Sequence, residues 1–100
     1  MIKVSINKKQ DVINEISIKG HSGYEEAGKD IVCAAVSSIS ITTVNALLSI
    51  DEDCISYTED EGLLNIKINK HNEIIDKLIN NMINLLEELE QDYKKYIEIR

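Results

Sequence analysis

The sequence contains no proline and only four glycines among its 100 residues. Disordered and collagen-like chains are rich in these two residues, so both classes are excluded. With 43% hydrophobic and 29% charged residues, the composition is instead that of a compact globular protein. A chain of this size buries roughly 60–70% of its unfolded surface, which is enough for one core without disulfides or metal. We therefore expect a single domain over residues 1–100.

Positive charge is also scarce. Lys and Arg total 11 against 18 Asp and Glu, which gives a formal net charge of −7. This charge would repel a polyanion, so direct nucleic-acid binding is disfavoured unless a local basic patch exists. The acidic clusters at 51–53, 59–61 and 87–92 are most simply solvated surfaces, and alternatively they attract a basic protein partner.

Cysteine is limited to Cys33 and Cys54, which allows at most one disulfide. No pattern typical of a signal peptide precedes them, so we expect a cytoplasmic protein with two free thiols. Residues 31–50 carry no charge and are long enough to span a membrane. However, seven of these twenty residues are Ser, Thr or Asn, and no basic cluster flanks the segment. We therefore predict a core helix and no membrane association.

Hydrophobic periodicity predicts five strands and two helices. Apolar residues alternate with polar ones over 2–7 and 15–19, which predicts an antiparallel hairpin with a polar link at 8–11. Two further strands are expected at 54–58 and 63–69, joined by a turn at 59–62. A helix over 73–92, capped by Asn72, and a last strand over 96–100 follow. The predicted fold is an α+β two-layer sandwich of ββαββαβ order, with both helices on one face of a mainly antiparallel sheet.

The uncharged segment 31–50 is predicted to form the central helix, with Asp30 as its N-cap. Because it has so little charge, we expect it to be covered on most sides. One small sheet cannot provide that cover, so a second subunit on the outer face of this helix is expected.

The start of this central helix is the strongest candidate for chemistry. Cys33 is its third residue, where backbone amides lack intrahelical partners and the helix dipole is positive. A helix N-terminus or a nearby imidazolium favours the thiolate form of a cysteine, which is the nucleophile. His21 lies in the glycine-rich segment 20–29, which could fold back and bring the imidazole to the thiol. The same amides could stabilise an oxyanion formed when Cys33 attacks a carbonyl.

Simpler structural interpretations of these residues remain open. Cys33 could be a core residue, since free cysteine is among the most buried residue types. His21 could be a surface turn residue and Asp30 an ordinary cap, although loss of this cap would loosen the site in either case. Ser37 lies one turn after Cys33 on the same helix face, so its hydroxyl either lines the site or bonds a helix carbonyl.

The other candidate residues favour no further site. Cys54 is interpreted as an ordinary strand thiol, because no His or helix start accompanies it. His71 is expected in a solvated loop before the second helix. No His/Cys spacing fits a zinc site, no acidic run fits an EF-hand, and no cofactor fingerprint is found, so neither metal nor cofactor is expected.

One stretch resembles a known family. Gly20-His21, Gly28 and the run Asp30-Ile31-Val32-Cys33-Ala34-Ala35-Val36-Ser37 are similar to the signature of the ribosomal-processing cysteine protease family Prp. The likeness extends over essentially the whole chain, although Ser22 stands where the family commonly has Ala. The resemblance implies an endopeptidase that removes a short N-terminal extension from bacterial large-subunit ribosomal protein number twenty-seven.

The same resemblance implies roles for particular residues. Cys33 is the nucleophile and His21 is the general base and acid, and a homodimer is also implied. From their positions in the sequence, Gly20, Asp30 and Ser37 are expected to support this site. The alternative function is a non-catalytic ribosome-associated assembly or binding module in which Cys33 belongs to the core. A redox or acyl-carrier thiol is least favoured, because no Cys-x-x-Cys motif is found.

Overall fold

The computed structural model of the chain describes residues 1–20 and 30–100. It has five strands and two helices in the order β1 (Ile2–Lys9), β2 (Val12–Lys19), α1 (Ile31–Ile50), β3 (Ile55–Asp60), β4 (Leu63–Ile68), α2 (Glu73–Asp92) and β5 (Ile97–Ile99). The predicted ββαββαβ order and the α+β class are confirmed.

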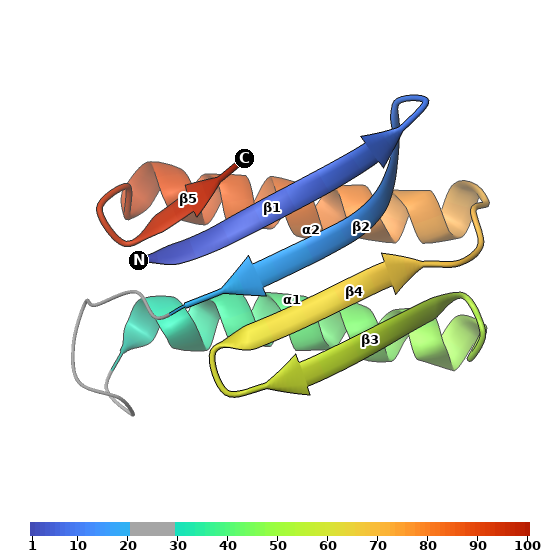
Figure 1. Cartoon of the computed structure of the whole chain (residues 1–100), viewed down its shortest axis with the longest axis horizontal. Helices are drawn as coiled ribbons and strands as arrows, with labels where there is room; N and C mark the ends of the chain where they lie inside the picture. The colour runs from blue at the N-terminus through green and yellow to red at the C-terminus, as the bar shows by residue number, and fades with distance from the viewer. Residues whose placement is uncertain (21–29) are drawn as a thin grey trace.

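The five strands form one mixed sheet in the order β3-β4-β2-β1-β5. Three of the four strand pairs are antiparallel, and only β5 runs parallel to its neighbour β1. Both helices cover the same face of this sheet, and the other face is open (Figure 1). The predicted two-layer sandwich is therefore confirmed, and α1 lies beneath the half of the sheet that contains β3 and β4.

Two turns are tighter than the sequence indicated. The link between β1 and β2 consists of Gln10 and Asp11, which have φ values of 54° and 65°. Two successive positive φ angles are typical of the two-residue hairpin turn whose twist matches the strands. In the second hairpin, β3 continues through Asp60 and only Glu61 and Gly62 form the turn, so the strands extend further than predicted.

The core lies between the sheet and the two helices. Alternate strand residues face the helices because side chains point to opposite faces along a strand. The largest fully buried apolar side chains are Val4, Ile16, Val32, Val44, Leu47, Ile66, Ile75, Met82, Leu86 and Ile97. Both helices and four of the five strands contribute to this set, so a single continuous core holds the two layers together.

Within the single chain α1 is covered on one face, so the predicted cover of its outer face by a second subunit stays a prediction. Its buried residues lie on one face, at three- and four-residue spacing: Val32, Val36, Ser40, Thr43, Val44 and Leu47. The outer face exposes the small uncharged residues Ala34, Ser38, Thr42 and Asn45. The hydroxyl and amide groups on this face carry no charge but are solvated readily in the single chain. Within the described part of the chain, α1 is also the one helix long and apolar enough to cross a membrane.

Gly20 ends β2 in a conformation that other residues rarely adopt. Its φ is +95°, and a Cβ at this position would lie 2.6 Å from the backbone oxygen of Met1. Its amide donates a hydrogen bond of 2.8 Å to the carbonyl oxygen of Gly62 in the β3–β4 turn. Gly20 therefore lets the chain leave the sheet between the N-terminus and that turn.

We predict that Gly20→Ala lowers the free energy of unfolding by about 1–3 kcal/mol, the usual cost of a strained backbone conformation. The added methyl group meets backbone atoms, which cannot rotate away as a flexible side chain could. Urea unfolding followed by circular dichroism measures the change, with exposed Asn7→Ala on β1 as the control. Equal stability of the two variants would contradict the prediction.

Candidate active site

The first turn of α1 is held by the side chain of Asp30. Its Oδ1 accepts hydrogen bonds from the amides of Val32, at 2.9 Å, and Cys33, at 3.0 Å, and the residue is 8% exposed. Asp30 is therefore the N-cap of α1, as predicted. Such a cap contributes about 1 kcal/mol, because it satisfies amides that have no partner inside the helix. It also fixes the backbone of the residue that carries the candidate thiol.

The same contacts limit what the first-turn amides can do. The amides of Val32 and Cys33 are bonded to the Asp30 side chain, and the Ala34 amide donates to the Asp30 carbonyl oxygen at 3.1 Å. The expectation that free amides at this helix start would hold an oxyanion is therefore wrong for these three. A cap that uses its side-chain oxygen for two amides competes with any ligand for the same donors.

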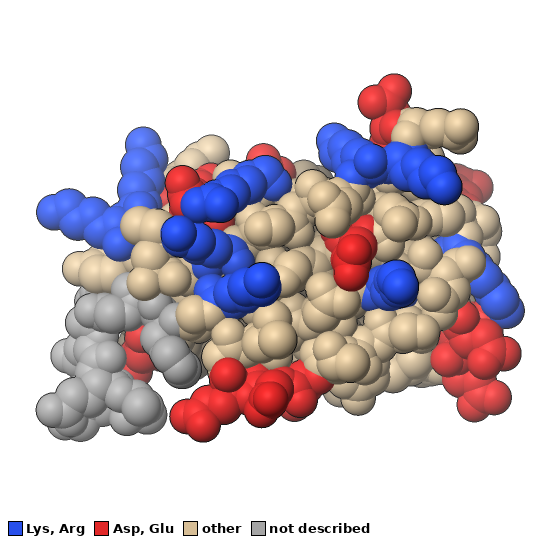
Figure 2. All heavy atoms as spheres, in the orientation of Figure 1, with Lys and Arg blue, Asp and Glu red and all other residues tan. Residues whose placement is uncertain are grey.

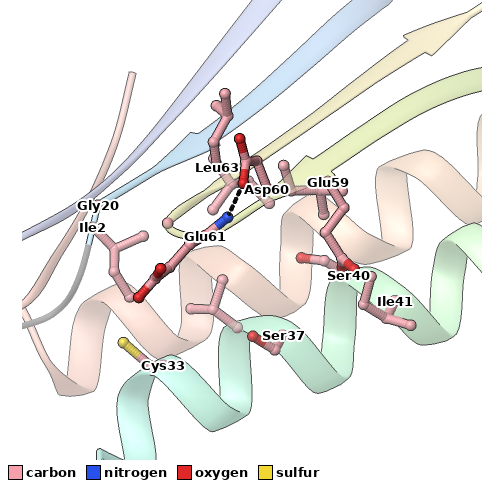
Figure 3. A pocket seen from close by; sticks show the side chains of 14 residues that line it. Ile2, Gly20, Cys33, Ser37, Ser40, Ile41, Glu59, Asp60, Glu61 and Leu63 are labelled. Atoms are coloured by element: carbon pink, nitrogen blue, oxygen red, sulfur yellow. Dashed lines mark hydrogen bonds between the residues drawn. The ribbon is translucent and has the colours of Figure 1, made fainter. Parts of the chain in front are cut away.

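Cys33 opens on a groove of about 500 Å³ between α1 and the sheet. Its side chain is half-buried, and Ser37, one helical turn later, is exposed and lines the same groove. Figure 3 shows these two residues and Ser40 along α1, with the β3–β4 turn opposite them. Gly20 closes the end of the groove at which Cys33 lies. The groove thus places a thiol and a hydroxyl side by side on one wall.

The structure brings together most of the residues singled out from the sequence. Gly20, Cys33 and Ser37 line one groove, and Asp30 caps the helix that supports it. His21 belongs to residues 21–29, which lie outside the described part of the chain. The expected approach of the His21 imidazole to the Cys33 thiol therefore stays a prediction.

Two features of the groove were missed by sequence reasoning. Ser40 is fully buried, and its hydroxyl has no hydrogen-bond partner among the described residues. An unsatisfied buried polar group costs about 1–3 kcal/mol. Its helical spacing of seven residues from Cys33 was the signal that could have placed it on this face. Glu59 and Glu61 also line the groove, but only the pairing of β2 with β4 brings them there.

Cys54 is in a different environment from Cys33. It lies immediately before β3 and not within a strand, is fully buried, and its Sγ donates to the Leu47 carbonyl oxygen at 3.4 Å. Burial raises the pKa of the Cys54 thiol, and the nearby Asp51 carboxylate raises this pKa further. Both effects oppose formation of the thiolate. The interpretation of Cys54 as a packing residue agrees with this environment.

The remaining candidates lie away from the groove. His71 is exposed before α2, where its Nδ1 lies 2.9 Å from Oδ1 of Asp76. Over residues 1–20 and 30–100, no group of three or more His, Cys, Asp or Glu side chains could hold a metal ion.

Comparison with known proteins places this geometry in a family. The sequence matches the family described as cysteine protease Prp over residues 1–98. This chain belongs to the cysteine protease Prp family. Two relatives are the ribosomal processing cysteine proteases Prp of Bacillus subtilis, 29% identical with 99% of this chain and 96% of the relative covered, and of Staphylococcus aureus, 26% identical with 99% and 97% covered.

A solved structure of a Prp protease agrees at the level of the fold. The crystal structure of the essential ribosomal processing protease Prp from S. aureus, in complex with a covalently linked product peptide, superposes with a TM-score of 0.92. The two chains are 25% identical, and the match covers 100% of this chain and 98% of the other. The family resemblance seen in the motif is thus confirmed, and the chain is a cysteine peptidase of the Prp type.

We predict that iodoacetamide alkylates Cys33 of the native protein and leaves Cys54 unmodified. The Cys33 side chain reaches the groove, whereas Cys54 is buried and its pKa is raised. Mass mapping of peptides after labelling near pH 7 locates the modification, and labelling in urea provides the control in which both thiols react. Protection of Cys33 in the native protein, to the same extent as Cys54, would contradict an accessible nucleophile.

Proposed function

We propose that this Prp-family protein is a cysteine endopeptidase that removes the N-terminal extension of large-subunit ribosomal protein number twenty-seven. The observation that carries the proposal is the position of Cys33, with its thiol on a groove beside a capped helix start. The groove is within the size range of sites that bind small ligands or short peptide segments. Support for the substrate comes from the relatives, which are ribosomal processing proteases, one of them holding a covalently linked product peptide.

The chemistry is acyl transfer with His21 as the proton carrier. His21 accepts the thiol proton as Cys33 Sγ attacks the scissile carbonyl carbon, and the carbonyl oxygen becomes an oxyanion. His21 then gives this proton to the amine of the leaving fragment, and the C–N bond breaks to leave a thioester on Cys33. In the second half, His21 removes a proton from water as the water attacks the thioester. The acid product departs and the proton returns to sulfur.

Three further residues support this site in the proposal. Asp30 fixes the backbone of Cys33 through the cap, and Gly20 gives the chain its path from β2 toward His21. Ser37 lies beside Cys33 in the groove and can donate a hydrogen bond to the bound peptide. These residues and the two reacting ones lie within one cysteine protease domain that we place over residues 1–100, in the cytoplasm and without a cofactor.

Cys33→Ala and His21→Ala are expected to lower kcat/KM by at least about 10³-fold, because both act in the same proton transfer and nucleophilic attack. The assay incubates each variant with a peptide that spans the extension of the same organism's ribosomal protein, and mass spectrometry locates the cut. Cys54→Ala is the matched control and should retain activity if it folds.

Equal loss of activity in Cys54→Ala with normal unfolding would contradict this assignment. Absence of cleavage by the unmodified protein would instead favour the non-catalytic binding module.

A homodimer is the remaining part of the proposal. It is supported by the outer face of α1, which carries only small uncharged residues between exposed Ile31 and Ile50, each 50% exposed. Small side chains let two helices approach closely. Light scattering after size exclusion at micromolar concentration should give a mass near twice 11.3 kDa, and Thr42→Arg on this face should return it to the monomer mass. A monomer mass for the unmodified protein would contradict the dimer.

A further inference from the structure

The wall of the groove that faces α1 contains three acidic residues, Glu59, Asp60 and Glu61. The side chains of Glu59 and Glu61, called the acidic rim below, turn toward the groove. Glu59 pairs with Leu64 across the β3–β4 hairpin, and Leu64 is buried against the helices. Cross-strand partners share a face of the sheet, so Glu59 also points toward the helix layer. Figure 3 shows Glu61 directed toward the end of the groove that holds Cys33, and Glu59 directed toward Ser40 and Ile41.

Asp60, between these two residues, is arranged differently. It pairs with exposed Leu63 and so belongs to the open face of the sheet. Its Oδ1 accepts a hydrogen bond of 2.8 Å from the Glu61 amide, which stabilises the turn. Strand alternation therefore directs Glu59 toward the groove, the turn directs Glu61 toward it, and the Asp60 side chain stabilises that turn.

The basic side chains of the described residues form no ion pair with the acidic rim. The ion pairs within these residues join Lys70 to Asp51, His71 to Asp76, Lys77 to Glu73 and Arg100 to Glu98. Lys3, Lys19 and Lys67 are exposed on β1, β2 and β4. Figure 2 shows basic side chains spread over the open sheet face and acidic ones gathered below it, at the edge where the β3–β4 turn lies. Within these residues the acidic rim has no basic partner.

Ser40 adds an independent observation at the same groove. Its side chain is fully buried on the groove face of α1, and its hydroxyl has no partner in the described parts of the chain. Native proteins rarely leave a buried hydroxyl unbonded. A polar group of a bound chain, reaching the groove floor between α1 and the acidic rim, would supply the missing hydrogen bond.

We propose that the groove selects a peptide with a Lys or Arg side chain close to the bond that is cut, and that the acidic rim binds this cation. The inference rests on the proposed function, since the peptide is the substrate of Cys33. The ammonium or guanidinium group pairs with the nearer of the two carboxylates, Glu61 at the Cys33 end of the groove or Glu59 beside Ser40, while the backbone of the peptide passes Cys33 and bonds the Ser40 hydroxyl. Opposite charges at contact distance make the rim a determinant of specificity, not of the chemical step.

The experiment uses paired peptides that differ in one charge. At each of several positions on both sides of the cut, the peptide carries either Lys or norleucine, which keeps the aliphatic stem without the ammonium group. The unmodified protein should cleave one Lys peptide with a kcat/KM about 10-fold higher than its norleucine counterpart, chiefly through a lower KM. In Glu59→Gln/Glu61→Gln, this preference should fall to about 2-fold or less.

A matched control distinguishes a local effect of the acidic rim from the electrostatic field of the whole protein. Glu87→Gln/Glu88→Gln removes the same two charges from the exposed face of α2 and should keep the preference for Lys. Equal rates on all Lys and norleucine pairs, or the same loss of preference in both double variants, would overturn the proposal.

Ser40→Ala should raise KM several-fold without lowering the unfolding midpoint. A lower midpoint with unchanged KM would mean that the hydroxyl serves only the fold.

Binding to the inactive Cys33→Ala variant distinguishes failure of this inference from failure of the proposed function. Fluorescence anisotropy with labelled Lys and norleucine peptides measures affinity without cleavage. A preference for the Lys peptide that is lost with the acidic rim supports the proposal even if the unmodified protein cuts nothing. Cleavage without any such preference would refute the cation site and leave the peptidase intact.

Discussion

The pairing of β2 with β4 is the constraint on which the site depends. These strands are far apart in the sequence, and their register places Lys19 opposite Leu63. One residue further along, the Gly20 amide bonds the Gly62 carbonyl oxygen at 2.8 Å. The chain leaves the sheet at this point to begin the segment that leads to α1. The β3–β4 turn is thus fixed beside the start of the helix, and a groove forms between them.

Local elements of this arrangement could be predicted from the sequence, because their signals act over a few residues. Asp30 and Asn72 cap their helices as expected, since each side chain accepts hydrogen bonds from backbone amides two or three residues later in the chain. The strand neighbours could not be predicted, because the parallel addition of β5 beside β1 and the contact of β2 with β4 depend on the whole core. For that reason the acidic run 59–61 was recognised as charged but not as part of the groove.

One expectation about α1 was wrong, and another stays a prediction. Absence of charge predicts cover by a second subunit, and in the single chain this face exposes residues such as Ser38, Thr42 and Asn45, whose polar groups water can solvate. Unpaired amides were expected at the helix start, yet the side chain that caps the helix bonds two of them. A strong cap and a free anion site make competing demands on the same donors. Asp30, the residue that predicts the helix start, therefore also bonds the amides that were expected to stabilise an oxyanion.

Net charge, taken alone, describes this protein poorly. A value of −7 argues against polyanions, yet the basic side chains lie mainly over the open sheet face, and carboxylates gather at the edge with the β3–β4 turn (Figure 2). Strand alternation produces this separation: Lys19 and Lys67 point away from the helices, whereas Glu59 points toward them. Screening in physiological salt limits the reach of each charge to about 8 Å. A ligand in the groove therefore meets the nearest carboxylates, and the identity of those few residues matters more than the sum over the chain.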